Sequence, residues 1–288
     1  MKKLLKRLTP PILWDLLKRI KPNYGFFGVY SEFSEVSYED PWLDVGWISG
    51  QKQKLSNLES SRNEQLFLPL PHLNDYLMIP CLLINLLSQK NSIKVLDHYG
   101  GTGFIYHVIY PYLLFPENVK WSVLDNPTLL KIGVDYTKQM VAQIEGDSLG
   151  ISYISDMPDP SLEKFDVIYV NSSVQYYSDY KKNIRDLIAL QPKYFIFTRL
   201  MSGEGITFVC YQKIFAKGTP CRFINSWEFS EIFRENGYDL IFKAPNKEEN
   251  YGRGSIHDRE FKDIPEENQT PFSIHMVFGK REEKKEAL

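Results

Sequence analysis

The sequence predicts an α/β fold in which a mostly parallel β-sheet carries helices on both faces. Between residues 93 and 199, five short apolar runs alternate with helical segments, and this alternation is typical of parallel sheets. The runs are rich in Ile, Val, Leu, Tyr and Phe, as expected for strands that are covered on both faces. A glycine-rich turn follows the first run, and such a turn lets the backbone approach a ligand closely.

The central elements follow from this pattern in chain order. The expected strands are Ile93–Asp97, Val119–Asp125, Ile151–Ser155, Asp166–Asn171, Tyr194–Arg199, Tyr238–Ala244 and Phe272–Gly279. The expected helices are Asn74–Ser88, Phe104–Leu114, Leu129–Ile144, Tyr180–Leu190 and Trp227–Glu235. Pro80 predicts a kink or a restart in the first helix. Asn225 and Glu228 have the spacing of a capping box for the last helix, and Gly237 is placed to end it.

The flanking segments are less regular. Ile206–Cys210 and Arg222–Ile224 predict an inserted hairpin, and 245–271 reads as a polar surface loop. Residues 22–70 read as irregular and aromatic-rich, with weak helical signals around Gln51–Leu66, which favours a lid or an extension. We therefore expect three parts, which are a basic helix with an aromatic extension over 1–70, a main domain over 71–280 and a charged tail over 281–288.

The composition excludes several classes of protein. The chain has 34 Lys and Arg against 36 Asp and Glu, a net charge of −2, and duplex nucleic acid usually requires a clearly basic face. Three cysteines without CxxC or CxxH spacing predict reduced thiols and no metal site, although Cys210 and Cys221 could close a loop. No apolar run approaches the ~20 residues of a spanning helix. We expect a cytoplasmic protein.

The first 21 residues form a separate basic feature. They hold seven Lys and Arg against one acid, Asp15. Apolar residues at helical spacing with Trp14 predict an amphipathic helix. Such a helix can lie on an anionic membrane surface, here the inner face, or dock on a partner protein. It can equally pack on the main domain or on a second subunit.

The glycine turn joins two acids. Asp97 ends the first strand, Gly100, Gly101 and Gly103 follow, and Asp125 ends the next strand. An acid at the second position is placed to accept hydrogen bonds from the two ribose hydroxyls of an adenosine-containing cofactor. A dinucleotide would bring a pyrophosphate to the helix N-terminus, where Asp97 already supplies negative charge. A cationic or zwitterionic ligand such as S-adenosylmethionine (SAM) suits this charge better than NAD.

These residues resemble the first motif of the class I SAM-dependent methyltransferases, an acid followed by G-x-G-x-G. Asp97, Gly101 and Gly103 match the acid and the last two glycines, while Tyr99 takes the place of the first and Gly100 indicates a shifted turn. The resemblance implies a Rossmann-like fold with seven strands, the last of them antiparallel. The residues it implies for SAM binding are Asp97, Tyr99, Gly100, Gly101, Gly103, Asp125, Asn126, Asp156, Asn171 and Ser172.

More narrowly, the chain resembles a methyltransferase family of bacterial surface-polysaccharide (O-antigen-type) biosynthesis clusters. The Pro10–Leu13 opening, the Gly25–Gly28 segment, the glycine turn, Gln212 and the Gly237–Tyr238 pair carry this resemblance. It implies O-methylation of a sugar or glycan precursor, so that the acceptor is a small molecule or a glycan. The Asn-Pro-Pro-Tyr motif of amino-methylating nucleic-acid enzymes does not occur after the fourth strand, which argues against nucleic-acid substrates.

The catalytic residue stays open at this level. Methyl transfer requires positioning of the acceptor and removal of its proton. His98, Tyr176 and Arg199 are candidates because each lies at or near a strand end, and Gln175 joins Tyr176 as a candidate for the substrate pocket. Arg199 could bind an anionic acceptor or form a salt bridge. The alternatives are a non-catalytic Rossmann-like scaffold or regulatory protein and a nicotinamide-dependent enzyme, the latter disfavoured by Asp97.

Overall fold

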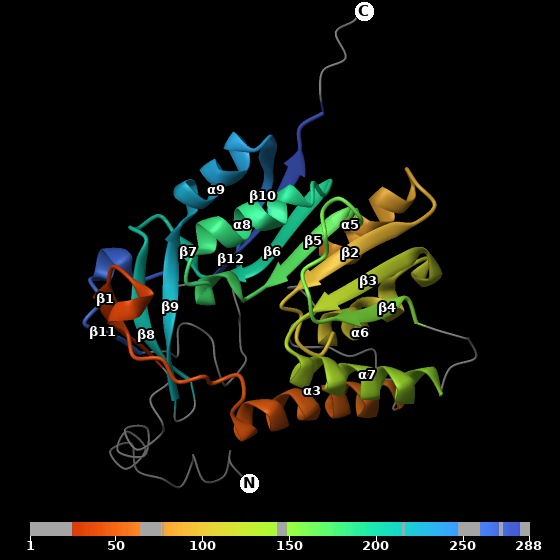
Figure 1. Ribbon diagram of the computed structural model, residues 1–288, viewed down its shortest axis with the longest axis horizontal. Coiled ribbons are helices and arrows are strands. Elements are labelled where there is room, and N and C mark those ends of the chain that lie inside the picture. The colour runs from red at the N-terminus through yellow and green to blue at the C-terminus, as the bar shows by residue number, and fades with distance from the viewer. Residues whose placement is uncertain are drawn as a thin grey trace, which may run out of the picture.

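The computed structural model describes residues 25–63, 76, 78–142, 149–214, 217–246, 260–270 and 273–282. They form a large sheet with helices on both faces and a smaller sheet beside it (Figure 1). The helix expected in residues 1–21 lies outside the described residues. No helix within the described ranges is both long enough and apolar enough to cross a membrane.

The large sheet has seven strands in the order β10-β12-β6-β5-β2-β3-β4. Its strands are β2 (Ile93–His98), β3 (Val119–Leu124), β4 (Ile151–Ile154), β5 (Val167–Asn171), β6 (Tyr194–Leu200), β10 (Tyr238–Asn246) and β12 (Ser273–Lys280). The strands from β6 to β4 are parallel, whereas β12 runs antiparallel to both β6 and β10. The predicted fold class is confirmed, including the antiparallel last strand.

Apolar side chains alternate between the two faces of this sheet. Along β6, Phe195 and Phe197 pack on one face and Ile196 on the other, and along β5 Ile168 and Tyr169 divide in the same way. Helices α5 (Met78–Leu87), α6 (Phe104–Ile109) and α7 (Pro127–Val141) cover one face, and α8 (Tyr180–Ala189) and α9 (Ser226–Glu235) cover the other. Each face therefore has its own core, as the unbroken apolar runs predicted.

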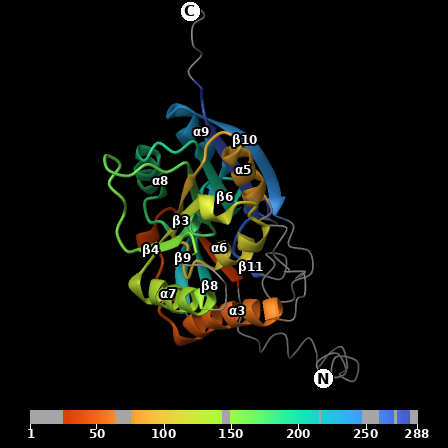
Figure 2. The ribbon, with the colours of Figure 1, turned by 90° about the vertical axis from the view of Figure 1, so that its right-hand side faces the viewer.

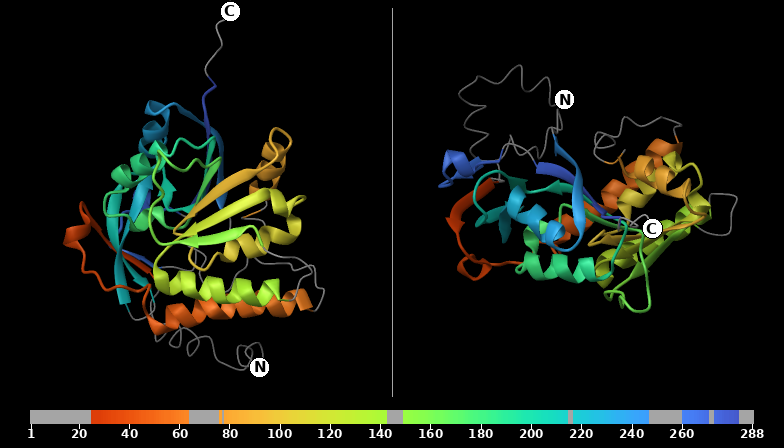
Figure 3. Two further views of the ribbon diagram at one scale, coloured as in Figure 1. Left: turned by 45° about the vertical axis from the view of Figure 1, so that its right-hand side comes forward. Right: turned by 90° about the horizontal axis from the view of Figure 1, so that it is seen from above.

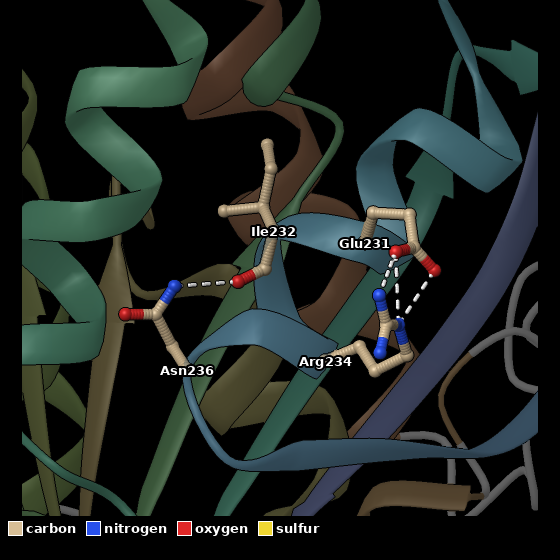
Figure 4. Close-up of polar contacts among 4 residues, drawn as sticks. All are labelled: Glu231, Ile232, Arg234 and Asn236. Atoms are coloured by element: carbon tan, nitrogen blue, oxygen red, sulfur yellow. Dashed lines mark hydrogen bonds and ion pairs between the residues drawn. The ribbon is translucent and has the colours of Figure 1, made fainter.

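Single residues determine where helices α6 and α9 end. Helix α6 is shorter than predicted because Pro111 follows it and the chain passes into the 3-10 turn Tyr110–Tyr112. The C-terminal end of α9 is drawn in Figure 4, where Asn236 donates through Nδ2 to the Ile232 carbonyl at 2.7 Å. Gly237 follows at φ +83°, so the predicted stop is confirmed.

Only half of the predicted capping box at the start of α9 forms. The Asn225 side chain accepts hydrogen bonds from the amides of Trp227 and Glu228, as predicted. The Glu228 carboxylate instead accepts from the Thr207 hydroxyl, and Thr207 accepts from the Asn225 amide. In a full capping box, the Glu228 carboxylate would accept directly from the Asn225 amide. Here the Thr207 hydroxyl bridges these two groups, and Thr207 lies too far away in the sequence for the spacing within the helix to reveal it.

The smaller sheet has the order β11-β1-β8-β9-β7. Its strands are β1 (Gly25–Tyr30), β7 (Ser202–Gly203), β8 (Phe208–Ile214), β9 (Lys217–Asn225) and β11 (Glu260–Lys262). The β8–β9 pair confirms the predicted hairpin and extends it. Cys210 and Cys221 lie opposite each other in this pair, buried and unbridged.

The prediction that residues 22–70 are irregular was wrong for strand β1 and for the start of helix α3, whereas the weak helical signal is confirmed over 51–63. Strand β1 pairs with β8 and β11, which are distant in the sequence, so no local pattern marks it. Helix α3 (Val45–Asn63) begins six residues before the predicted helical signal. It buries few residues, among them Gln51, Leu55 and Leu58, so its periodicity is weak. It packs on α6 and α7 (Figures 2 and 3).

The expected division into three parts remains a prediction, because residues 64–75 lie outside the described ranges. Strand β1 from the expected extension nevertheless shares a sheet with β8 from the expected main domain. At the other end, the Arg281 amide donates to the Gly237 carbonyl and its guanidinium to Asp239, both at 2.8 Å. The first residue of the expected tail is therefore attached to the large sheet.

Candidate functional site

Three strained residues lie at the carboxyl ends of neighbouring strands. Tyr99 follows β2, Ser172 follows β5 and Arg199 is the penultimate residue of β6, with φ angles of +55°, +54° and +56°. The left-handed region costs a residue with a side chain about 1–2 kcal/mol, and such strain clusters at functional sites. Ligands of open α/β sheets also bind outside the carboxyl ends of the strands. This edge of the sheet is the candidate site.

The glycine turn is shaped around the Asp97 carboxyl group. A Cβ atom on Gly100 would lie 2.4 Å from Cγ and Oδ2 of Asp97, so only glycine fits there. Gly101 and Gly103 adopt φ angles of +63° and +71°, which glycine tolerates without strain. A Cβ on Gly101 would meet no atom of the described residues within 4 Å, which leaves room there for a ligand.

Asp97 is fully buried and incompletely hydrogen-bonded. Trp121 Nε1 donates to its Oδ2 at 3.1 Å, while Oδ1 has no hydrogen-bond partner among the described residues. Burial raises the pKa of Asp97 to about 7; the Trp121 hydrogen bond opposes this rise and the Asp125 charge adds to it. A buried acceptor without a donor costs about 1–3 kcal/mol, so the arrangement favours a ligand that brings a donor.

Asp125 is attached directly to the turn. Its Oδ2 accepts a hydrogen bond from the Gly101 amide at 2.7 Å, and its Oδ1 accepts from the backbone and side-chain nitrogens of Asn126 at 2.7 and 2.9 Å. Burial raises the pKa of Asp125, and these hydrogen bonds oppose the rise. The side-chain oxygen of Asn126, Oδ1, caps α7 by accepting hydrogen bonds from the amides of Thr128 and Leu129. The structure therefore gives Asn126 a positioning role beside Asp125.

Asp156 and His98 lie at the same edge in different surroundings. Asp156, two residues after β4, is exposed and accepts a hydrogen bond from the Ser155 hydroxyl at 2.8 Å. His98 is buried, its Nδ1 is 2.8 Å from the Tyr177 hydroxyl, and its ring centroid is 4.5 Å from that of Tyr99. Burial lowers the pKa of His98 to about 4, so the imidazole is neutral at pH 7.

A relay of hydroxyl groups orients Asn171 at the end of β5. The Thr198 hydroxyl donates to Asn171 Oδ1 at 2.9 Å, and the Tyr169 hydroxyl lies 2.8 Å from Thr198 Oγ1. Since the single Thr198 proton is used on Asn171, Tyr169 must be the donor to Thr198. In the next turn, Gln175 Nε2 donates to the carbonyl and hydroxyl oxygens of Ser172. The Gln175 Oε1 atom is buried and has no partner within the described ranges.

Aromatic residues of the N-terminal segment meet the end of β5. The Trp42 ring lies edge-on to Tyr176, with centroids 4.7 Å apart, and 4.9 Å from the Trp47 ring. The Tyr176 hydroxyl donates to Gln212 Oε1 on β8 at 2.9 Å. Lys54 of α3 lies over the Trp47 ring, with Nζ 5.7 Å from its centroid. Three distant segments of the chain thus meet at the predicted pocket residue Tyr176.

Several residues of this site escaped the sequence analysis, among them Lys54, Trp121, Tyr177 and Thr198. Trp121 and Thr198 sit inside apolar strands, where a tryptophan or a threonine is ordinary. Tyr177 follows the predicted pair Gln175 and Tyr176, so a wider search after that strand would have included it. Lys54 gives no sequence signal, because only the position of α3 brings it here. Among the described residues no group of His, Cys, Asp and Glu could hold a metal ion.

Comparison with known proteins gives neighbours in fold only. No family model matches the sequence, and neither does any curated protein. Magnesium protoporphyrin IX methyltransferase from Synechocystis PCC 6803 is 10% identical, with a TM-score of 0.48 over 74% of this chain and 84% of the other. The 1,6-didemethyltoxoflavin-N1-methyltransferase of Burkholderia thailandensis is 13% identical, with a TM-score of 0.44 over 86% and 94%.

A SAM-dependent methyltransferase from Aquifex aeolicus is 14% identical, with a TM-score of 0.41 over 78% of this chain and 97% of the other. The structural neighbours are thus methyltransferases with diverse substrates. At identities of 10–14% and TM-scores below 0.5, nothing about the chemistry of this chain follows from them.

Proposed function

We propose that the protein is a SAM-dependent methyltransferase that methylates a hydroxyl group of a sugar or glycan precursor. The observation that carries this proposal is the pair of acids at the glycine turn. Asp97 offers a buried oxygen without a donor, and Asp125 is joined to the Gly101 amide. A ligand with an ammonium group supplies the donor that Asp97 lacks, and its ribose hydroxyls would add donors to the oriented carboxylate of Asp125.

The residues present fit SAM better than a dinucleotide. The cofactor's amino group would bind Asp97 Oδ1, its ribose hydroxyls would bind Asp125, and its methionine part would pass over Gly100 and Gly101. Asp97 would repel the pyrophosphate of NAD at this turn. The half-exposed ring of Tyr99, 48% accessible, lies beside this path and would flank the cofactor.

Bound SAM would supply a methyl group on a sulfonium: the methyl carbon bonds to an acceptor oxygen, the C–S electron pair stays on sulfur as a neutral thioether, and the acceptor proton passes to solvent water. The chain's part is to hold the acceptor in line. On this proposal, the acceptor hydroxyl would be held by Gln175 Oε1, which has no donor among the described residues, and by the Asn171 amide, which Thr198 orients. The rings of Trp42 and Tyr176 offer apolar surface of the kind that packs on the C–H face of a sugar.

The narrower resemblance supports a glycan acceptor in surface-polysaccharide biosynthesis, with the protein acting in the cytoplasm. On this proposal the basic residues 1–21 dock it on a partner or on the inner face of the membrane. Co-sedimentation with anionic liposomes, compared between the full chain and a variant that lacks residues 1–21, tests the membrane version. Equal pelleting of both proteins would reject that version.

Calorimetric titration with SAM, S-adenosylhomocysteine and NADH tests the cofactor. We expect the wild-type protein to bind the first two, and Asp125→Ala to weaken both about tenfold or more, since a hydrogen bond to a charged group contributes about 1.5–3 kcal/mol. The matched control is Asp186→Ala, which removes an exposed acid paired with Lys182 on α8 and should leave affinity unchanged. Binding of NADH alone would refute the proposal.

Tyr99 in the first glycine position favours a second candidate, a non-catalytic protein that binds SAM. Transfer of a labelled methyl group to a panel of neutral and anionic sugars separates the two candidates. Transfer to any member supports the enzyme. Cofactor binding without transfer to any of them supports the second candidate.

A further inference from the structure

A chain of polar side chains connects two helices and an edge strand to the glycine turn. His107 of α6 and Thr137 of α7 lie side by side, with 3.1 Å between Nε2 and Oγ1, and Thr137 Oγ1 lies 2.8 Å from the Tyr153 hydroxyl of β4. The Tyr153 hydroxyl in turn donates to the Thr102 carbonyl at 3.3 Å. Three elements therefore converge on the peptide group between Thr102 and Gly103, inside the turn.

The protons in this chain have one consistent arrangement. A carbonyl oxygen only accepts, so the single Tyr153 proton is used on Thr102, and Tyr153 must accept from Thr137. Thr137 has then used its own proton and must accept from His107 Nε2, which also lies 3.5 Å from the Tyr153 hydroxyl. Burial raises the pKa of Tyr153 to about 12, so the hydroxyl keeps at neutral pH the proton that it donates.

Two glycines make room for the Tyr153 ring beside the turn. A Cβ atom on Gly103 would lie 3.0 Å from the Tyr153 hydroxyl oxygen, and a Cβ on Gly133 would lie 2.5 Å from both Tyr153 Cε1 and the Thr102 carbonyl oxygen. Gly133 stands in the interior of α7, where glycine is unfavourable relative to alanine. The close approach of α7 to Tyr153 and to the turn accounts for a glycine at this position.

The turn is thus held at two adjacent points. Asp125 accepts a hydrogen bond from the Gly101 amide at 2.7 Å, and Tyr153 donates to the Thr102 carbonyl. Gly101 and Gly103, on either side of Thr102, have left-handed φ angles, and glycine is the residue with the greatest backbone freedom. A fixed Thr102 carbonyl therefore restricts both of these flexible positions.

We propose that Tyr153 is a positioning residue for the cofactor: its hydroxyl, oriented by Thr137 and His107, holds the glycine turn in the conformation that receives the ligand. This inference rests on the proposed function, because it concerns the same cofactor site. Tyr153 acts through the backbone of the turn rather than by contact with the cofactor. A turn that is fixed before binding loses less conformational freedom when the ligand binds, and this raises affinity.

Calorimetric titration of S-adenosylhomocysteine into the full-length protein tests this role. Tyr153→Phe removes only the hydroxyl, and of the pair Thr137→Val and Thr137→Ser only the second keeps a hydroxyl. The matched control is Tyr238→Phe, because the buried Tyr238 hydroxyl also donates to a backbone carbonyl, that of Pro192, at 2.8 Å. Tyr238 lies in β10, at the opposite edge of the large sheet from β4. Urea unfolding of each ligand-free variant measures its stability.

We expect Tyr153→Phe and Thr137→Val to weaken binding about fivefold, since a hydrogen bond typically contributes about that much. Thr137→Ser should match wild type. Tyr238→Phe should lower the urea midpoint about as much as Tyr153→Phe and leave affinity unchanged. A purely structural Tyr153 would lose stability without losing affinity, and that result would overturn the proposal. Unchanged affinity in Thr137→Val, or an equal loss in Thr137→Ser or Tyr238→Phe, would also overturn it.

Hydrogen exchange gives a second readout that needs no ligand. The Gly103 amide donates to the Gly100 carbonyl at 3.1 Å, so its exchange rate reports opening of the turn. We expect exchange about fivefold faster in Tyr153→Phe than in wild type, and unchanged in Tyr238→Phe. Equal rates in wild type and Tyr153→Phe would contradict the proposal. If wild type fails to bind S-adenosylhomocysteine, the proposed function fails, while hydrogen exchange still decides whether Tyr153 holds the turn.

Discussion

Asp97 should destabilise the ligand-free protein near neutral pH, and Asp97→Asn should remove that effect. The carboxyl group is fully buried, and burial raises its pKa from the ordinary value of 3.8 to about 7. Each unit of difference between the two pKa values corresponds to 1.36 kcal/mol. Ionisation of Asp97 therefore costs the folded state up to about 4 kcal/mol above pH 7. The variant keeps an oxygen that can accept from Trp121 Nε1 and never ionises.

The sign of the pH dependence follows from the direction of the shift. Because the pKa of Asp97 is higher in the folded state, the folded protein binds more protons than the unfolded chain between about pH 4 and pH 7. The contribution of this group to the free energy of unfolding is therefore fully present below pH 4. It falls as the pH rises from 4 toward 7 and is lost above the folded-state pKa. The advantage of Asp97→Asn over wild type should grow by about 2–3 kcal/mol between pH 5 and pH 8.

Thermal unfolding of both proteins without ligand measures this advantage. At roughly 2 °C per kcal/mol for a chain of this length, the gain in Tm should be about 5 °C larger at pH 8 than at pH 5. Asp186→Asn, an exposed acid on α8, should show no such difference. The reasoning is refuted if the gain is the same at both pH values, or if Asp97→Asn is the less stable protein at pH 8.

Three further outcomes follow from the same site. Affinity for SAM should fall as the pH is lowered from 8 to 6, because protonated Asp97 no longer attracts an ammonium group; a flat calorimetric profile would contradict this. Gly100→Ala should abolish cofactor binding by driving a Cβ against the Asp97 carboxyl. Gly101→Ala, whose Cβ meets no described residue within 4 Å, should cost only about 1–2 kcal/mol of backbone strain, measured by urea unfolding. Ellman's reagent should find one fast thiol, the exposed Cys81, in the native protein, since the other two cysteines are buried; three fast thiols would show that the smaller sheet opens.

The large sheet was predictable because its strands carry their own signal. Both faces of β2, β3, β5 and β6 are mostly buried, so most of their residues are apolar and the runs stand out. The Asp97–Gly103 turn was predictable for a related reason. Positive φ angles favour glycine over other residues, so the turn leaves a local motif in the sequence. The antiparallel last strand came from the resemblance to a family rather than from any property of the residues.

What could not be predicted depends on contacts between distant segments. Strand β1 exists because β8 and β11 lie beside it, and the position of α3, which carries Lys54, depends on its packing against α6 and α7. The structure also changes the reading of His98. Its ring nitrogen is engaged by the Tyr177 hydroxyl and its pKa is lowered to about 4, so it is a weak base at neutral pH. A strand-end position alone does not reveal such burial.

The order of strands places opposite charges at opposite ends of the site. Asp97 and Asp125 lie at the ends of β2 and β3, whereas Arg199 lies at the end of β6, with β5 between them. On the proposed function, the cofactor's ammonium group pairs with Asp97, so an acceptor at the end of β6 meets a guanidinium and not a carboxylate. If Arg199 contacts an anionic acceptor, Arg199→Gln should raise KM for an anionic sugar more than for a neutral one. An equal change for both sugars would show that Arg199 does not bind the acceptor's charge.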